Sequence, residues 1–170
     1  MNRDLSLVDI VLSRRSIRSY EQKEIPMDVL NQILEAGRQA PSAANRQPFH
    51  FIVVTDEKIK KEFSKGLFNR FIKNAPLIIV GCANTSALIT GKWAVVDTTI
   101  ALQNMVIAAW AAGIGSCWIG DYKEKKVKQT LQIPEKWKVV ALVSFGYPDE
   151  EPKPRKKKPI TKLVSFNKFS

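Results

Sequence analysis

The sequence predicts an α+β fold. Helical and strand-type patterns follow one another in mixed order, without the regular alternation of strand and helix that is typical of parallel α/β proteins. The chain has 170 residues, of which 45% are hydrophobic. This length supports one core and is too short for two ordinary domains. We therefore expect one domain over residues 1–170, in which residues 149–170 form a basic C-terminal extension.

Local signals place the elements in order. Ser6 and Asp9 have capping-box spacing, which predicts a short amphipathic helix that ends at Ser13. Pro26 stands where a second helix begins, and apolar residues repeat at helical spacing until Gly37. Apolar runs and helical patterns then predict strands at 51–54, 76–83, 114–119 and 138–145, and helices at 57–65, 92–112 and 123–131.

The longest helical pattern, residues 92–112, is apolar on nearly all of its faces. Gly113 follows it, where a left-handed residue commonly ends a helix. We expect this helix to be central and buried, partly against another chain. Asp97, a polar residue within it, is expected to make an interface or buried polar contact and is given no catalytic role.

The net charge of +11 is concentrated at the C-terminal end. Residues 151–170 hold seven basic residues and one acidic residue, which gives +6 of the total. The run Arg155–Lys158 has two open interpretations, a solvated segment that aids solubility and an anion-binding segment. The apolar residues of ITKLVSF, which follow this run, predict that the end of the chain packs against protein.

Several classes of protein are disfavoured. No run approaches the roughly 18 apolar residues of a membrane helix, and the first residues, MNRDLSLVDI, do not resemble a signal peptide. We expect a soluble, cytoplasmic protein without a membrane partner. Cys82 and Cys117 are isolated thiols, and the single histidine, His50, is near neither, which argues against a metal site or a disulfide scaffold. There is no GxGxxG after a strand and no P-loop.

A first candidate site is RRSIRSY, where Arg14, Arg15 and Arg18 surround Ser16. Arginine matches phosphate oxygens in bidentate fashion, and a serine hydroxyl can add a further donor. The segment therefore suits an anion. The alternative is that the arginines neutralise the C-terminus of the preceding helix.

A second candidate site is PSAANRQPFHF. Asn45 and Gln47 each offer a donor and an acceptor, as needed to read the polar edge of a planar heterocycle, and Ser42 begins a run of small residues that permits close approach. The alternative is an ordinary loop, since these residue types are common in turns. His50 is expected to be a packed or partly exposed strand residue rather than a general base.

A third candidate is GIGSCWIG, residues 113–120, where glycines flank an aromatic residue. Backbone amides and the face of Trp118 could approach a flat ligand there. The alternative is a helix cap followed by a buried edge strand.

Taken together and in this order, SRRSIRSY, PSAANRQPFHF, the helix leading into GIGSCWIG and the terminal PRKKKPI resemble the nitroreductase family. The resemblance implies an α/β/α sandwich around a mostly antiparallel sheet, and a homodimer built through long helices. It also implies FMN bound without a covalent link at the dimer interface, and a C-terminal segment that crosses to the partner and adds to its sheet.

The resemblance also implies roles for individual residues. Arg14, Ser16 and Arg18 would contact the phosphate, the ribityl chain and the N1/O2 side of the flavin, and Arg18 would stabilise the reduced flavin. Trp118 and its two successors would lie near the reactive N5 from the other subunit. The full set of expected cofactor-binding residues is Arg14, Arg15, Ser16, Arg18, Ser42, Asn45, Gln47, Trp118, Ile119, Gly120, Arg155 and Lys157, without a catalytic protein residue or a metal.

The implied activity is hydride transfer from NAD(P)H through FMN to nitroaromatics or quinones by a ping-pong mechanism. Related members instead dehalogenate, oxidise thiazolines or fragment flavin, and these chemistries remain alternatives. A non-catalytic basic module that binds nucleic acid is a further alternative. The run Arg155–Lys158 lacks the interleaved aromatic residues that are usual in such modules, so nucleic acid is not expected as a partner.

Overall fold

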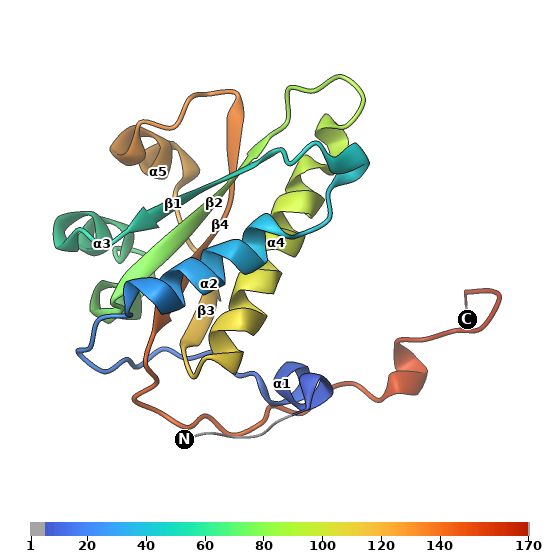
Figure 1. The fold of residues 1–170 in the computed structure, drawn as a ribbon, viewed down its shortest axis with the longest axis horizontal. Coiled ribbons are helices and arrows are strands. Elements are labelled where there is room, and N and C mark those ends of the chain that lie inside the picture. Colours follow the sequence, from blue (N-terminus) through green and yellow to red (C-terminus); the bar gives the residue numbers. More distant parts are fainter. Residues whose placement is uncertain (1–5, 170) are drawn as a thin grey trace.

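The computed structural model describes residues 6–169. Four strands form one antiparallel sheet in the order β1–β2–β4–β3 (Figure 1). The strands are β1 (Phe49–Val54), β2 (Leu77–Asn84), β3 (Gly115–Ile119) and β4 (Trp137–Gly146). The helices are α1 (Leu7–Ser13), α2 (Met27–Arg38), α3 (Glu57–Phe63), α4 (Ala94–Ala111) and α5 (Glu124–Leu131). The α+β prediction is confirmed, and so is each predicted helix and strand, with ends that differ by one or two residues.

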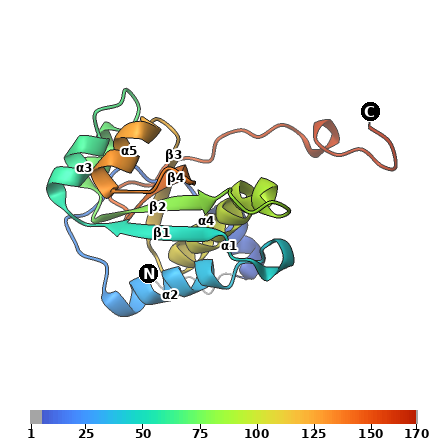
Figure 2. The same ribbon diagram turned by 90° about the horizontal axis from the view of Figure 1, so that it is seen from above.

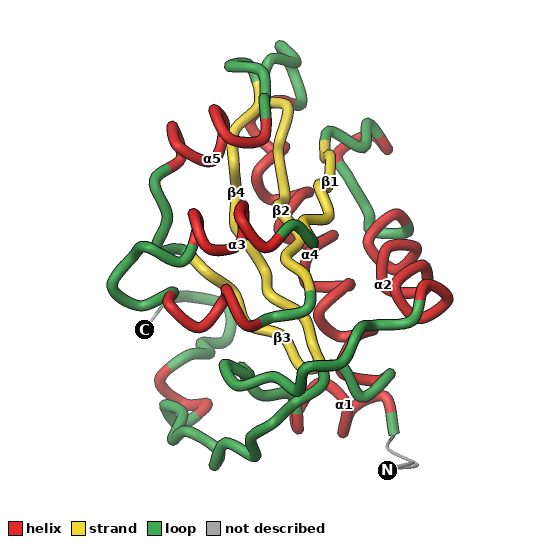
Figure 3. Tube along the Cα trace, turned by 90° about the vertical axis from the view of Figure 1, so that its left-hand side faces the viewer, coloured by secondary structure: helices red, strands yellow, loops and turns green. Residues whose placement is uncertain are grey.

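The sheet is the middle of three layers (Figures 2 and 3). Helices α2 and α4 cover one face, where their apolar side chains pack with Ile79, Val143 and Phe145 of the sheet. Helices α3 and α5 cover the other face, which presents Ile78, Val80 and Leu142. Both faces are therefore buried, which explains why β2 and β4 are continuous apolar runs in the sequence.

Two glycines let α4 approach its neighbours closely. A Cβ atom built on Gly37 of α2 would lie 2.0 Å from Cε of Met105, and one built on Gly81 of β2 would lie 2.6 Å from Cδ1 of Leu102. Met105 and Leu102 are both fully buried. A larger residue at either position would require the side chain of Met105 or Leu102 to shift within the packed core.

Among residues 6–169, one helical segment, Gly91–Ala111, is long and apolar enough by length and composition to cross a membrane. It consists of α4 and the 3₁₀ turn before it, and α4 packs on the sheet and on α2. A core helix passes the same test, and the packing accounts for its composition. The expectation of a central, buried helix is confirmed for the side of α4 that faces the sheet and α2.

The opposite side of α4 remains exposed. Trp93 and Val96 lie near the start of the helix with about half of their surface accessible. Helix α1 has no buried residue, and its Leu7, Val8 and Leu12 are more than half exposed. Large exposed apolar side chains of this kind are common at interaction sites.

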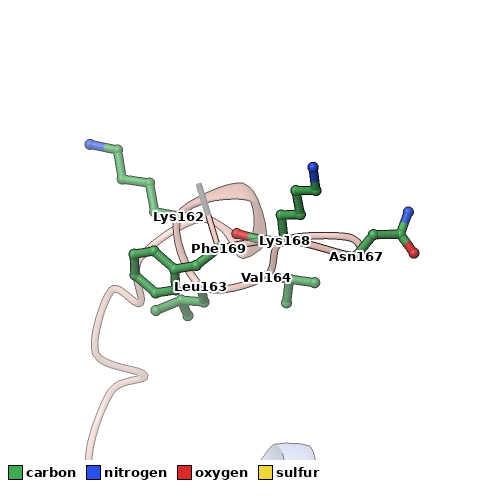
Figure 4. Close-up of a pocket in the computed structure, with 7 residues that line it drawn as sticks. Lys162, Leu163, Val164, Asn167, Lys168 and Phe169 are labelled. Carbon is green, nitrogen blue, oxygen red and sulfur yellow. The ribbon is translucent and has the colours of Figure 1, made fainter.

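The C-terminal segment, residues 149–169, leaves the body of the protein (Figures 1 and 2). It contains one 3₁₀ turn, Ile160–Lys162, and Phe166 and Phe169 are almost fully exposed. A hollow of about 370 Å³ is lined by residues of this segment alone. Figure 4 shows their side chains, among them Leu163, Val164 and Phe169. The apolar residues of ITKLVSF therefore do not pack on their own subunit, and their crossing to a partner stays a prediction.

Candidate functional site

A cleft of about 420 Å³ lies at the edge strand β3. Four segments that are far apart in the sequence line this cleft. They are the arginine segment (RRSIRSY, residues 14–20), the loop between α3 and β2, the end of β3, and the C-terminal extension. The lining residues are Arg18, Phe68, Phe71, Cys117, Trp118, Ile119, Gly120, Asp121 and Arg155. Arg18, Arg155 and the 118–120 turn thus line one cleft of a single chain, whereas the 118–120 turn was expected to reach the flavin from the other subunit.

The arginine segment lies along β3 and is fixed by backbone pairing. Ser16 forms a parallel bridge with Ser116, and the N–H of Ile17 donates to the carbonyl of Ser116 at 2.9 Å. The side chain of Ile17 is buried and fills the space above Gly115, where a Cβ would lie 2.6 Å from Cγ1 of Ile17. Residue 17 therefore anchors the segment in the core.

Tyr20 provides a second anchor for the arginine segment. Its buried hydroxyl donates to the carbonyl of Ile17 at 2.6 Å and lies 2.7 Å from Oγ of Ser144 on β4. Burial raises the pKa of the Tyr20 phenol, partly offset by the Ser144 hydrogen bond, so this hydroxyl stays protonated. Whereas the Tyr20 side chain points into the core, the Arg18 side chain lies at the cleft. Its guanidinium is over the ring of Phe71, 6.0 Å from the ring centroid.

Arg15 is not among the residues that line the cleft, and its contact with the cofactor stays a prediction. Its Nη1 donates to the carbonyls of Leu12, Ser13 and Arg14 at 2.8–3.0 Å. These are carbonyls at the end of α1, which lack partners within the helix. The alternative interpretation of the arginine cluster, neutralisation of a helix C-terminus, is therefore confirmed for Arg15.

Cys117 forms part of the cleft lining and reports on its electrostatics. Burial raises the pKa of the thiol, while Arg18, a hydrogen bond with Ser16, and Arg14 act in the opposite direction. Arg14 and Ser16 thus lie close enough to this part of the cleft to act on one of its groups. Of the four residues predicted in the RRSIRSY segment, Arg18 alone is among those that line the cleft.

The loop between α3 and β2 supplies an aromatic wall that the sequence did not predict. Asn69 is buried, and its Nδ2 donates to the carbonyls of Phe63 at 2.7 Å and Asp121 at 2.5 Å. The N–H of Phe68 donates to Oδ2 of Asp121 at 2.8 Å. These bonds join the loop to the turn after β3 and place Phe68 and Phe71 at the cleft. Two phenylalanines in a polar loop carry no local signal of this role.

The turn Ser42–Gln47 also has an ordered and strained geometry. Its 3₁₀ turn and the following residues include three non-glycine residues with positive φ, at Ala44 (51°), Asn45 (52°) and Gln47 (50°). Oγ of Ser42 accepts from the N–H of Gln47 at 2.9 Å. Clustered left-handed residues cost free energy, and they persist where surrounding contacts impose them, frequently at functional sites.

Within one chain, this turn and the end of α1, which precedes the RRSIRSY segment, contact opposite ends of α4, whose course Figure 1 shows. The N–H of Ala43 donates to the buried carboxylate of Asp97 in the first turn of α4 at 3.2 Å. Nε1 of Trp110, in the last turn, donates to Oγ of Ser13 at 3.0 Å, immediately before Arg14. The helical rise of 1.5 Å per residue gives about 20 Å between Asp97 and Trp110. The predicted site residues therefore form two groups, not one.

The remaining candidates fall as follows. Arg155 lines the cleft, whereas Lys157 lies on the exposed segment outside its lining. The cap and edge-strand interpretation of GIGSCWIG is confirmed, because Gly113 has a φ of 77° and β3 is mostly buried, yet its last residues also line the cleft.

Asp97 makes the expected buried polar contact, and His50 is an exposed strand residue whose ring meets Trp137 edge-on. Between residues 6 and 169, no group of three or more His, Cys, Asp or Glu side chains is arranged to hold a metal ion.

Comparison with known proteins agrees with this architecture. The sequence profile of the nitroreductase family matches residues 11–77 and 60–147. An Archaeoglobus fulgidus protein whose name provisionally assigns it as an NADH dehydrogenase/NAD(P)H nitroreductase is 40% identical over 149 residues, which cover 84% of this chain and 85% of that protein. The NADPH-flavin oxidoreductase of Vibrio harveyi is 25% identical over 95% of this chain and 74% of its own length. The structure of an FMN-dependent nitroreductase from Clostridium difficile superposes with a TM-score of 0.83, at 33% identity, over 95% of this chain and 99% of that one.

The electrostatics of the two cysteines generate a prediction. Burial raises the pKa of Cys82 to about 11, and it also raises that of Cys117. Because the thiolate is the reactive form, both should react slowly with an aromatic disulfide reagent at pH 8 in the native protein. In guanidinium chloride the same reagent should titrate two thiols per chain. Rapid release of one equivalent from the native protein would show that Cys117 is an accessible thiolate.

Proposed function

The chain belongs to the nitroreductase family, and from that premise we propose that it is an FMN-dependent NAD(P)H oxidoreductase whose flavin site is completed by a second copy of the chain. The observation that carries the proposal is the cleft at β3, where Arg18 and Arg155 lie beside aromatic side chains and the backbone of the 118–120 turn. A planar, anionic cofactor needs this combination of flat walls and fixed positive charge. The cleft volume, about 420 Å³, is within the usual range for small-ligand sites.

The residues of the cleft suit the individual parts of FMN. Arg14 and Ser16 would hold the phosphate, since guanidinium forks and a hydroxyl donor match its oxygens. Arg18 would lie against the ring, because its guanidinium is at the cleft over Phe71. Arg155 would approach from the C-terminal extension. Lys157, which follows on the same extension, remains a proposed contact that would require this segment to close over the phosphate.

The second polar group, around Asn45 and Gln47, would come from the partner subunit. These side chains are exposed, lie about 20 Å along α4 from the arginine segment, and sit on a strained turn. Around a two-fold axis that crosses α4, the first half of one helix lies beside the last half of the other. The turn of one subunit would then approach the cleft of its partner.

The exposed apolar surfaces support this dimer. Helix α1, the free side of α4 and the C-terminal segment present large apolar side chains to solvent in one chain. A homodimer that covers them would bury a surface typical of permanent complexes. The extension from residue 149 onward would then pack on the partner, as the sequence predicts for ITKLVSF.

When bound, FMN supplies the redox chemistry, accepting hydride from NAD(P)H and passing reducing equivalents to an acceptor. The protein residues position the cofactor and set the local charge. The fixed charge of Arg18 would stabilise the negative charge that develops on the ring during reduction, and it would do so without reorganisation. Donor and acceptor would occupy the same cleft in turn, which gives a ping-pong mechanism. Nitroaromatics and quinones are the proposed acceptors, since both are planar and fit between aromatic walls.

The first prediction concerns the cofactor. Titration of the protein should quench FMN fluorescence at one equivalent per chain. Replacing Arg14 by Ala should weaken binding by about 1.5–3 kcal/mol, the range for hydrogen bonds to charged groups. Arg38→Ala is the matched control, because Arg38 is exposed on α2 and pairs with Glu35. Equal affinity of the two variants would remove Arg14 from the phosphate site.

The second prediction concerns assembly. Light scattering at low micromolar concentration should give twice the chain mass of 19.2 kDa. Val96→Asp places a charge on the exposed apolar side of α4 and should yield monomers that bind FMN more weakly. Lys61→Asp, on α3 at the other face of the sheet, should leave the dimer intact. A wild-type monomer that binds FMN with full affinity would contradict the shared site.

The third prediction concerns turnover. With menadione or a simple nitroaromatic as acceptor, initial-rate plots at several fixed acceptor concentrations should be parallel. NADH or NADPH alone should bleach the flavin absorbance under anaerobic conditions, before any acceptor is added. Intersecting plots would exclude the ping-pong mechanism. Failure of both nicotinamide cofactors to bleach the flavin would favour the specialised chemistries of the family, such as dehalogenation.

A further inference from the structure

The chain leaving β4 pairs with the arginine segment just beyond the cleft. Tyr20 and Pro148 form an antiparallel bridge. Two backbone hydrogen bonds flank it, from the N–H of Glu21 to the carbonyl of Tyr147 and from the N–H of Asp149 to the carbonyl of Ser19, both at 3.0 Å. Residues 19–21 and 147–149 thus form a short ladder that no sequence pattern predicted.

Glu150 continues this ladder with its side chain instead of its backbone. One carboxylate oxygen, Oε1, accepts from the backbone N–H of Arg18 and from that of Ser19, the latter at 3.1 Å. Hydrogen bonds from backbone N–H groups to a carboxylate are charge-assisted and stronger than those between neutral groups. The neighbouring carboxylate of Asp149 makes a longer contact, 3.4 Å, to the hydroxyl of Ser19. Glu150 is therefore the residue that holds the backbone at Arg18.

The contact of Glu150 with the backbone of Arg18 and Ser19 connects the two segments that carry the cationic residues of the cleft. Arg18 lines one wall, and its backbone position sets the point from which its side chain reaches the cleft. Arg155, on the other wall, follows Glu150 by five residues on the C-terminal extension. The same carboxylate thus fastens the segment that carries Arg18 to the start of the segment that carries Arg155.

We propose that Glu150 is a positioning residue for the flavin site, which acts through the backbone of Arg18 and fixes the separation of Arg18 and Arg155. This inference rests on the proposed function. In this role, Glu150 needs only one side-chain oxygen that can accept hydrogen bonds from the backbone N–H groups of Arg18 and Ser19. Its negative charge opposes the binding of an anionic cofactor. A glutamine has the same length and an amide oxygen that accepts hydrogen bonds, whereas an aspartate keeps the charge and is one methylene shorter.

The test uses FMN titration of the full-length protein, followed by fluorescence quenching. Glu150→Ala and Glu150→Asp should each raise the dissociation constant about tenfold, while Glu150→Gln should stay within twofold of wild type or bind more tightly. Asp149→Ala, the adjacent carboxylate control, should also stay within twofold. Circular dichroism and thermal unfolding of the FMN-free variants check that each is folded, and the Asp and Gln variants decide the question if the Ala variant is not.

A double-mutant cycle tests the route of action. If Glu150 acts through Arg18, Arg18→Ala should cost at least threefold less affinity in the Glu150→Ala background than in wild type. Additive effects would overturn the proposal, as would full affinity of Glu150→Asp combined with weak binding by Glu150→Gln. Wild-type protein that binds no FMN would overturn both this inference and the proposed function, whereas equal binding by wild type and all Glu150 variants would overturn this inference alone.

Discussion

The packing of α4 against the sheet and α2 determines where the candidate site residues lie. Gly37 and Gly81 bring the helix into contact with both layers. Asp97 at its start then holds the turn that presents Asn45, and Trp110 at its end holds α1 through Ser13, next to the arginine segment. A straight helix cannot shorten, so the two polar groups stay about 20 Å apart in one chain. The two polar groups can therefore form one site only if a second chain brings them together.

The backbone conformation of the turn Ser42–Gln47 is unfavourable in free energy, and contacts elsewhere in the fold must offset it. Non-glycine residues in sparsely populated backbone regions cost on the order of 1–3 kcal/mol each, and three occur here within four positions. The bonds from Ala43 to Asp97 and from Gln47 to Ser42 hold the turn in this form. Such a turn presents exposed polar side chains in a fixed orientation, which reduces the entropy lost when a ligand is bound.

The sequence predicted the elements well because their signals are local. Ser6 is the N-cap of α1, with the N–H of Asp9 donating to its Oγ. The joint order of motifs predicted that Arg18 and Trp118 belong to a flavin site, with Trp118 from the other subunit, whereas both line one cleft of a single chain. Phe68 and Glu150 gave no signal, because their roles arise from contacts between segments distant in the sequence. The contacts of Arg15 with the end of α1 could not be told from residue type, because the position of the helix end decides which acceptors its guanidinium reaches.

A shared site couples cofactor binding to assembly. In the proposed dimer each FMN contacts the arginine segment of one chain and the Asn45 turn of the other, so it binds the dimer more tightly than the monomer. Thermodynamic linkage then requires FMN to strengthen the dimer by the same factor by which dimerisation strengthens FMN binding. The exposed apolar side chains of α1 and of the C-terminal segment would be uncovered in any monomer, which adds a solvation cost to dissociation. Loss of the flavin and exposure of aggregation-prone surface are consequently expected to occur together on dilution.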